Sequence, residues 1–296
     1  MRKDICLGFT IIFANILLAG CGKKDEIEST IALLTCPENF VAVPANPDLG
    51  VVSEFCVAQF EMKNVDGVAT SQAESLPWAM INQTDAKTAC TSLGANYDLI
   101  SIAEWMTIAS DIEKSAANWS GGMVGNGMMN RGHSDNTPSN ALEVTNTANP
   151  YSDTGNLSDE PSRLGWEQKR THTLSNNKLI WDFAGNVWEW TDWSDGPTLT
   201  YGPTSCGAAW VEIPTVSCGE LSGAEYMPAN PAAIASANYN SVYGVGQFYG
   251  GSGGSARRGG SWVNGAQAGV FALSLNDLDG AKYVNVGFRC VFRHEI

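Results

Sequence analysis

The sequence predicts an α+β fold that is rich in loops and contains two main helices. Two amphipathic stretches, 84–94 and 101–112, carry capping signals typical of helices. Two short stretches, 39–43 and 54–62, alternate apolar and polar residues as strands with one buried face do. The 31 Gly and 12 Pro residues indicate many turns and exclude a plain helical bundle.

The first helix is expected to start at Thr84, whose hydroxyl can cap it, and to end at Gly94. Its apolar stripe consists of Ala86, Ala89, Cys90 and Leu93. The second helix opens with Ser101 and Glu104 at the spacing of a capping box. Its apolar stripe consists of Trp105, Ile108, Ala109 and Ile112.

Charge and composition limit the classes of partner. The formal net charge is −14, from 17 basic and 31 acidic side chains, and no cluster of Lys and Arg is present that could neutralise phosphates. A nucleic-acid partner is therefore excluded. Residues 121–177 and 195–255 lack periodicity and are expected to form long loops.

The first 20 residues have the composition of an export signal, with an apolar stretch, 5–18, that is short for a membrane span. The following Leu18-Ala19-Gly20-Cys21 resembles the lipobox of bacterial lipoproteins, which implies cleavage before Cys21 and lipidation of its thiol. The membrane is then a partner through the lipid anchor, and Gly22 favours sorting to the outer membrane. A plain secretory signal, or a short anchor helix with a coincidental cysteine, is the alternative.

Five segments carry a family resemblance. Trp181–Trp190 (WDFAGNVWEW), Arg258–Trp262 (RGGSW) and Gly287–Cys290 (GFRC) resemble the formylglycine-generating enzymes, or sulfatase-modifying factors. Pro77-Trp78 and Leu99–Trp105 resemble the N-terminal half of that family. The resemblance implies a C-type-lectin-like fold with small antiparallel sheets.

The resemblance covers residues 38–293, so one domain over residues 36–296 is expected, after a tether of residues 21–35. Six of the eight cysteines follow Cys21, and sequence alone leaves their fifteen possible pairings open. Cys206 and Cys218 bracket one loop, which favours a local bridge, and the lectin-like fold implies a long-range bridge between Cys90 and Cys290. The expected pairs are Cys36–Cys56, Cys90–Cys290 and Cys206–Cys218.

The family binds calcium at the segment that matches Trp181–Trp190. Carried over, the resemblance assigns carboxylate ligands to Asp182 and Glu189 and carbonyl ligands to Gly185 and Val187, and the oxygen chemistry suits calcium. The calcium would be structural. In the alternative interpretation the segment is a Trp-rich turn whose carboxylates bond backbone amides.

Catalytic chemistry has little support in the sequence. The copper-dependent oxidases of the family keep two cysteines after the RGGSW motif, but Val263–Val270 contains none, so no copper is expected. The histidines, His133, His172 and His294, lack metal-binding spacing. We therefore name no catalytic residue, and the sequence favours a protein that is not an enzyme.

Residues 262–286 also resemble the variable segment of proteins that diversity-generating retroelements diversify, which bind ligands on the same fold. The resemblance assigns ligand contacts to Trp262, Val263, Gln267, Ser274, Asn276, Asp277, Lys282, Tyr283 and Asn285. Val270, Phe271, Leu273 and Leu275 are expected in the core. An undiversified surface loop is the alternative.

These observations favour a non-catalytic lipoprotein that binds a protein or glycan at the bacterial cell envelope. An oxidoreductase of the formylglycine-generating type with a non-standard site is one alternative, and a structural or accessory envelope protein is another. Calcium-dependent sugar binding of the ordinary lectin kind is disfavoured because neither Glu-Pro-Asn nor Gln-Pro-Asp occurs.

Overall fold

The computed structural model describes residues 35–155, 163–192, 209–213, 240–250, 255–278 and 280–294, which all belong to one compact unit, Leu34–Ile296. No helix within these ranges is long and apolar enough to cross a membrane. The expected α+β architecture is confirmed, with small sheets, many loops and two main helices.

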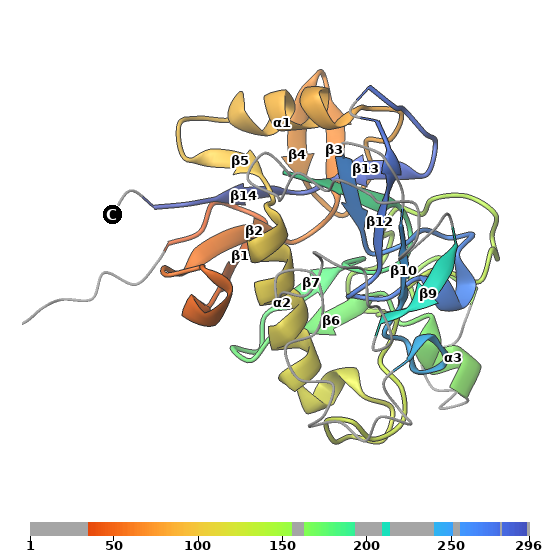
Figure 1. The fold of residues 1–296 in the computed structure, drawn as a ribbon. Helices are drawn as coiled ribbons and strands as arrows, with labels where there is room; N and C mark the ends of the chain where they lie inside the picture. Colours follow the sequence, from red (N-terminus) through yellow and green to blue (C-terminus); the bar gives the residue numbers. More distant parts are fainter. Residues whose placement is uncertain are drawn as a thin grey trace, which may run out of the picture. The chain divides into compact units, whose positions relative to one another are not determined.

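The first sheet is antiparallel throughout and brings the two ends of the described chain together (Figure 1). In spatial order its strands are β1 (Phe40–Val43), β2 (Phe55–Ala58), β14 (Cys290–Phe292) and β5 (Tyr97–Leu99). The last strand of the chain is thus a central strand, between β2 and β5.

The second sheet carries three of the residues expected to bind ligand, Ser274, Asn276 and Asp277, all on one strand. In spatial order its strands are β13 (Val286–Phe288), β8 (Trp188–Thr191), β11 (Ser255–Arg258), β12 (Leu273–Asp277), β10 (Gln247–Tyr249) and β9 (Trp210–Glu212). Pairing is antiparallel except between β10 and β12 and between β13 and β8, which are parallel. The remaining strands of the described residues form two hairpins. Strand β3 (Met62–Val65) pairs with β4 (Val68–Ser71), and β6 (Thr171–Thr173) pairs with β7 (Leu179–Trp181).

Helix α2 (Ile102–Lys114) confirms the prediction for the second helix. The Ser101 hydroxyl accepts a hydrogen bond from the Glu104 N–H, and the Glu104 carboxylate accepts one from the Ser101 N–H, which is the complete capping box. The predicted stripe is buried and packs in the larger core cluster. A short third helix, α3, spans Arg163–Glu167, and 3₁₀ turns span Pro47–Leu49, Ala116–Asn118, Ser241–Tyr243 and Gly265–Gln267.

Helix α1 (Gln83–Thr91) begins earlier than predicted. Its N-cap is Asn82, whose side chain accepts a hydrogen bond from the Asp85 N–H at 2.7 Å, so the expected cap at Thr84 is wrong. Asn is a stronger N-cap than Thr, and starting at Asn82 adds hydrogen-bonded residues to a short helix. The predicted strand 54–62 is likewise interrupted after Ala58, because Glu61 turns into the interior between β2 and β3.

Two of the three expected disulfides, Cys36–Cys56 and Cys90–Cys290, are present. The second joins helix α1 to strand β14 across 200 residues of sequence. Cys206 and Cys218 lie outside the described residues.

The RGGSW motif is explained by close packing against the following loop. Gly260 has a φ of +87°, and a Cβ placed on it would lie 2.5 Å from the Cβ of Ala268. The loop then enters the core, where the residues expected there, Val270, Phe271, Leu273 and Leu275, are all buried.

Candidate functional site

The nine residues expected to bind ligand differ widely in their exposure to solvent. Four are exposed, two are half-buried and three are buried, so the set does not form one open surface. The exposed residues are Val263, Asn276, Lys282 and Tyr283, and the half-buried ones are Gln267 and Asn285. Trp262, Ser274 and Asp277 are buried, which corrects the expectation that they face solvent.

Asp277 is buried because an arginine of the neighbouring strand covers it. The Asp277 carboxylate lies 2.8 Å from the Arg257 Nε, so the two residues form an ion pair. The Arg257 guanidinium also lies over two rings, 5.1 Å from the centroid of Trp188 and 5.5 Å from that of Tyr283. A hydrogen bond to Asp277, together with partial burial, raises the pKa of the Tyr283 phenol. The buried ion pair therefore holds an exposed tyrosine in place.

An aromatic row continues from Trp188 toward the far edge of the same sheet. The rings of Trp188 and Trp210 are stacked at 6.0 Å, and Trp210 meets Tyr249 edge-on at 5.0 Å. Trp210 and Tyr249 face each other in the β9–β10 register and remain partly exposed. The sequence did not predict these two residues, because both come from the aperiodic stretch 195–255. We call Arg257, Asp277, Tyr283, Trp210, Tyr249 and Asn276 together the sheet face.

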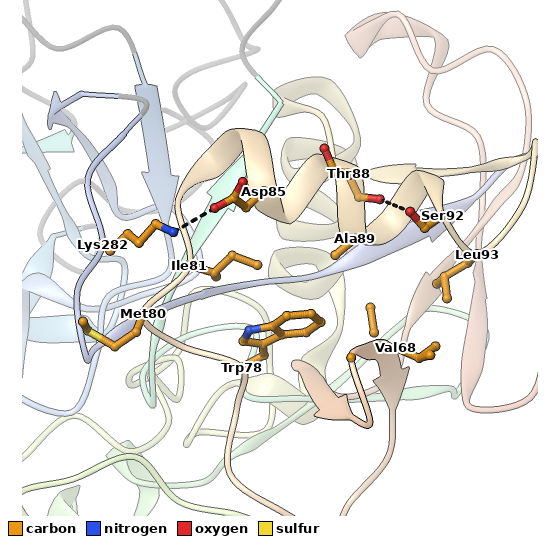
Figure 2. A pocket seen from close by; sticks show the side chains of 12 residues that line it. Val68, Trp78, Met80, Ile81, Asp85, Thr88, Ala89, Ser92, Leu93 and Lys282 are labelled. Atoms are coloured by element: carbon orange, nitrogen blue, oxygen red, sulfur yellow. Dashed lines mark hydrogen bonds and ion pairs between the residues drawn. The ribbon is translucent and has the colours of Figure 1, made fainter.

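A pocket of about 440 Å³ lies beside the sheet face, between α1 and the β3–β4 hairpin (Figure 2). The indole of Trp78 lies in its centre, below Ala89 of α1, with Ile81 on one side and Val68 and Leu93 on the other. At the rim Lys282 pairs with Asp85 at 2.8 Å, and both side chains are about half exposed. Lys282, one of the residues expected to bind ligand, thus lines this pocket, and the next residue, Tyr283, belongs to the sheet face.

The segment Trp181–Trp190 forms a buried ionic network instead of an open turn. Arg170 binds both carboxylate oxygens of Asp182 at 2.7 Å. Arg289 binds both oxygens of Glu189, the shorter contact being 2.7 Å. All four side chains are at most 3% exposed.

Two further charges in this network were not predicted from the sequence. Glu61 accepts hydrogen bonds from the Asn186 side chain at 2.6 Å and from the Val187 N–H at 3.1 Å. Lys63 is 1% exposed and interacts electrostatically with Glu61 and Asp182. Burial raises the pKa of Glu61 to about 8 and lowers the pKa of Lys63 to about 8. Glu61 directly precedes β3 and Lys63 lies in it two positions later, and this spacing of opposite charges was the available signal.

The expected calcium ligands do not fit calcium in this arrangement. The oxygens of Asp182 and Glu189 already accept from two arginines, and in the described part of the chain no three His, Cys, Asp or Glu side chains gather into a metal-binding group. The calcium site expected from the sequence and the arrangement of these side chains therefore predict opposite results, which a direct measurement separates.

We expect millimolar calcium, or EDTA after calcium, to leave the Tm of the domain unchanged, because Arg170, Arg289 and Lys63 already balance the three buried carboxylates. Differential scanning calorimetry in the two buffers measures this. A calcium-dependent rise in Tm would contradict the fit and support the family's metal site.

Most cysteine and histidine side chains among the described residues are disulfide-bonded or buried. Each cysteine among the described residues is in a disulfide. His133 and His172 are fully buried, with Nε2 bonded to the carbonyls of Asn140 and Asn130, and burial lowers both pKa values, that of His172 to about 4. His294 is exposed.

Comparison with known proteins places the whole domain in one family. Residues 38–294 match the family described as the sulfatase-modifying factor enzyme 1-like domain, in agreement with the expected span. No curated protein matches the chain.

The solved structures that match include a variable protein and two variants of a tropism determinant. Treponema denticola variable protein 1 is 15% identical with a TM-score of 0.40, and the alignment covers 82% of this chain and 85% of that one. The Major Tropism Determinant U1 and I1 variants are each 12% identical, with TM-scores of 0.32 and 0.34, and the alignments cover 88% of this chain and 54% of theirs. The match over residues 38–294 shows that the chain belongs to the sulfatase-modifying factor enzyme 1-like domain family.

Proposed function

We propose that this domain is a non-catalytic binding module that recognises a protein or glycan through the sheet face. The main support is the ion pair between Arg257 and Asp277, because the Arg257 guanidinium contacts both the exposed Tyr283 ring and the exposed Asn276 side chain. A tyrosine held in one position contributes contact area at low entropic cost, and neighbouring amides supply adaptable hydrogen bonds. The partly exposed Trp210 and Tyr249 extend this surface.

The family itself supports a second candidate, an oxidoreductase or sulfatase-modifying factor with a non-standard site. Such an enzyme needs a reactive thiol or a redox metal. Thiol counting and metal analysis on the purified chain separate the two functions. A reactive thiol with bound copper or iron would favour the enzyme.

The lipobox resemblance supports display of the module at the bacterial envelope. A lipid on Cys21 would hold the domain at the membrane through the tether of residues 21–35 and raise its local concentration there. Metabolic labelling with a clickable fatty acid tests this, since Cys21→Ser should abolish incorporation.

The binding function is tested with residues 22–296 on a glycan array and a displayed peptide library. We expect Tyr283→Ala and Asn276→Ala each to weaken capture of the selected ligand about tenfold or more, the loss typical of a central contact residue. Val52→Ala is the matched control, because Val52 is 71% exposed and lies before β2, outside the sheet face. Unchanged capture by both sheet-face variants would contradict the proposal.

A further inference from the structure

We propose that the Trp78 pocket anchors one bulky apolar side chain of a protein ligand, next to a cationic residue of that ligand. This inference rests on the proposed binding function and names the ligand class. Every residue that lines the pocket except Lys282 lies outside the segment that the sequence assigned to binding, and half of them belong to α1 and the β3–β4 hairpin (Figure 2). Its volume of about 440 Å³ lies in the range of protein ligand sites, which is about 300–1,000 Å³.

The rim contains an exposed apolar residue in an unfavourable backbone conformation. Met80 has a φ of +57° and is 55% exposed, although non-glycine residues with a long side chain rarely adopt this conformation. Its N–H donates to the carbonyl of Tyr283 at 2.9 Å, so the same contact ties the pocket rim to the sheet face. Packing within the domain does not require an apolar side chain at this exposed position, whereas contact with a ligand does.

Two exposed apolar residues line the pocket, and two more lie near its lining residues in the sequence. Val68 and Met80 line it, Leu76 lies two residues before Trp78, and Val284 follows Tyr283 directly. Each of these four apolar side chains is more than half exposed. Such an apolar rim around a concave site is typical of protein-binding surfaces.

The polar groups of the pocket favour an apolar side chain over a sugar. The Thr88 hydroxyl donates to the Thr84 carbonyl at 2.9 Å, and the Ser92 hydroxyl donates to the Thr88 carbonyl at 2.7 Å. Both hydroxyl protons are thus used inside α1, and the Asp85–Lys282 pair is the main polar feature left at the rim. A sugar needs several free donors and acceptors at once, and an aliphatic or aromatic side chain needs none.

Charge selects the neighbouring residue of the ligand. The chain carries a net charge of −14, and the Asp85 side chain is 52% exposed in a pair that solvent screens. A lysine or arginine of the ligand can therefore share Asp85 with Lys282 and is attracted by the overall field. An acidic residue at the same place can contact only Lys282 and is repelled by that field.

The test uses labelled hexapeptides with a central Trp, Leu or Ser, flanked by either Lys or Glu, added to residues 22–296. NMR follows the indole N–H signal of Trp78, which Trp78→Phe assigns. We expect the Lys-flanked Trp and Leu peptides to shift this signal and to bind about 10- to 100-fold more tightly than the Ser peptide, as burial of one large side chain implies. Glu flanks should weaken binding.

Two exposed positions provide variants that keep the fold. Met80→Glu and Val68→Glu should each abolish the peptide-induced shift, whereas Val52→Glu should retain it, since Val52 lies outside the pocket. The anchor would be overturned if the Ser and Trp peptides bound the domain equally tightly. It would also be overturned if glycans, and not the peptides, shifted the Trp78 signal. Capture that depends on Asn276 and not on Met80 would overturn the anchor alone and leave the binding function intact. Capture that depends on neither Asn276 nor Met80 would reject both the anchor and the proposed binding function.

Discussion

Replacing Arg289 with methionine lowers the free energy of unfolding by about 3–5 kcal/mol, the usual cost of leaving one partner of a buried ion pair alone. Arg289 is fully buried and binds both oxygens of Glu189. It also donates to the carbonyls of Ala58 and Trp181, at 2.8 and 2.9 Å. The substitution leaves a buried carboxylate and two buried carbonyls without this donor. Urea unfolding followed by circular dichroism measures the loss.

Two controls separate the buried charge from the loss of a long side chain. The double variant Arg289→Met with Glu189→Gln should regain part of the lost stability, because the unpaired charge is then absent. Lys282→Met breaks an ion pair whose side chains are 45% and 52% exposed, and it should cost less than about 1 kcal/mol. Equal losses for Arg289→Met and Lys282→Met would show that burial of the network contributes nothing.

The titration of His172 alone lowers the free energy of unfolding by about 3 kcal/mol as the pH decreases from about 6.5 to 4. His172 is fully buried, and this burial lowers its pKa to about 4, although its hydrogen bond to the Asn130 carbonyl acts in the opposite direction. Below pH 6.5 the unfolded chain takes up a proton on this histidine and the folded chain does not. The stabilising contribution is therefore complete above pH 6.5 and is lost as the pH falls through 4.

The measurement is the difference in unfolding free energy between the native chain and His172→Gln at several pH values, because carboxylates and His133 also respond to acid. A glutamine amide can still donate to the Asn130 carbonyl, so the folded structure keeps that bond. The difference should shrink as the pH decreases. His294→Gln is the control, since His294 is exposed and its removal should leave the pH profile unchanged. Parallel profiles for the native chain and His172→Gln would contradict the prediction.

Local signals in the sequence predicted those elements that local hydrogen bonds and long motifs determine. The capping box at Ser101 and Glu104 located α2, because both of its bonds join residues three positions apart. The start of α1 was misplaced because Asn82 and Thr84 can both cap a helix, and the stronger N-cap of the two is used.

The candidate site was predicted only in part because contacts between distant segments determine exposure. Alternation along β12 cannot reveal that Arg257 of the neighbouring strand covers Asp277. Nor can sequence spacing reveal that Arg170, twelve residues before Asp182, turns back onto its carboxylate, or that Glu61 reaches Val187. The Trp78 pocket combines three such segments, so no single stretch of sequence predicts it.

The central position of β14 also affects how the chain must be made. Strand β14 fills the gap between β2 and β5, and Arg289 bonds to Ala58 across 231 residues of sequence. The first sheet is therefore complete only after residues 290–292 have been synthesised and have left the ribosome. Until then β2 and β5 each lack a neighbouring strand on one edge, and chaperones can bind such exposed edges.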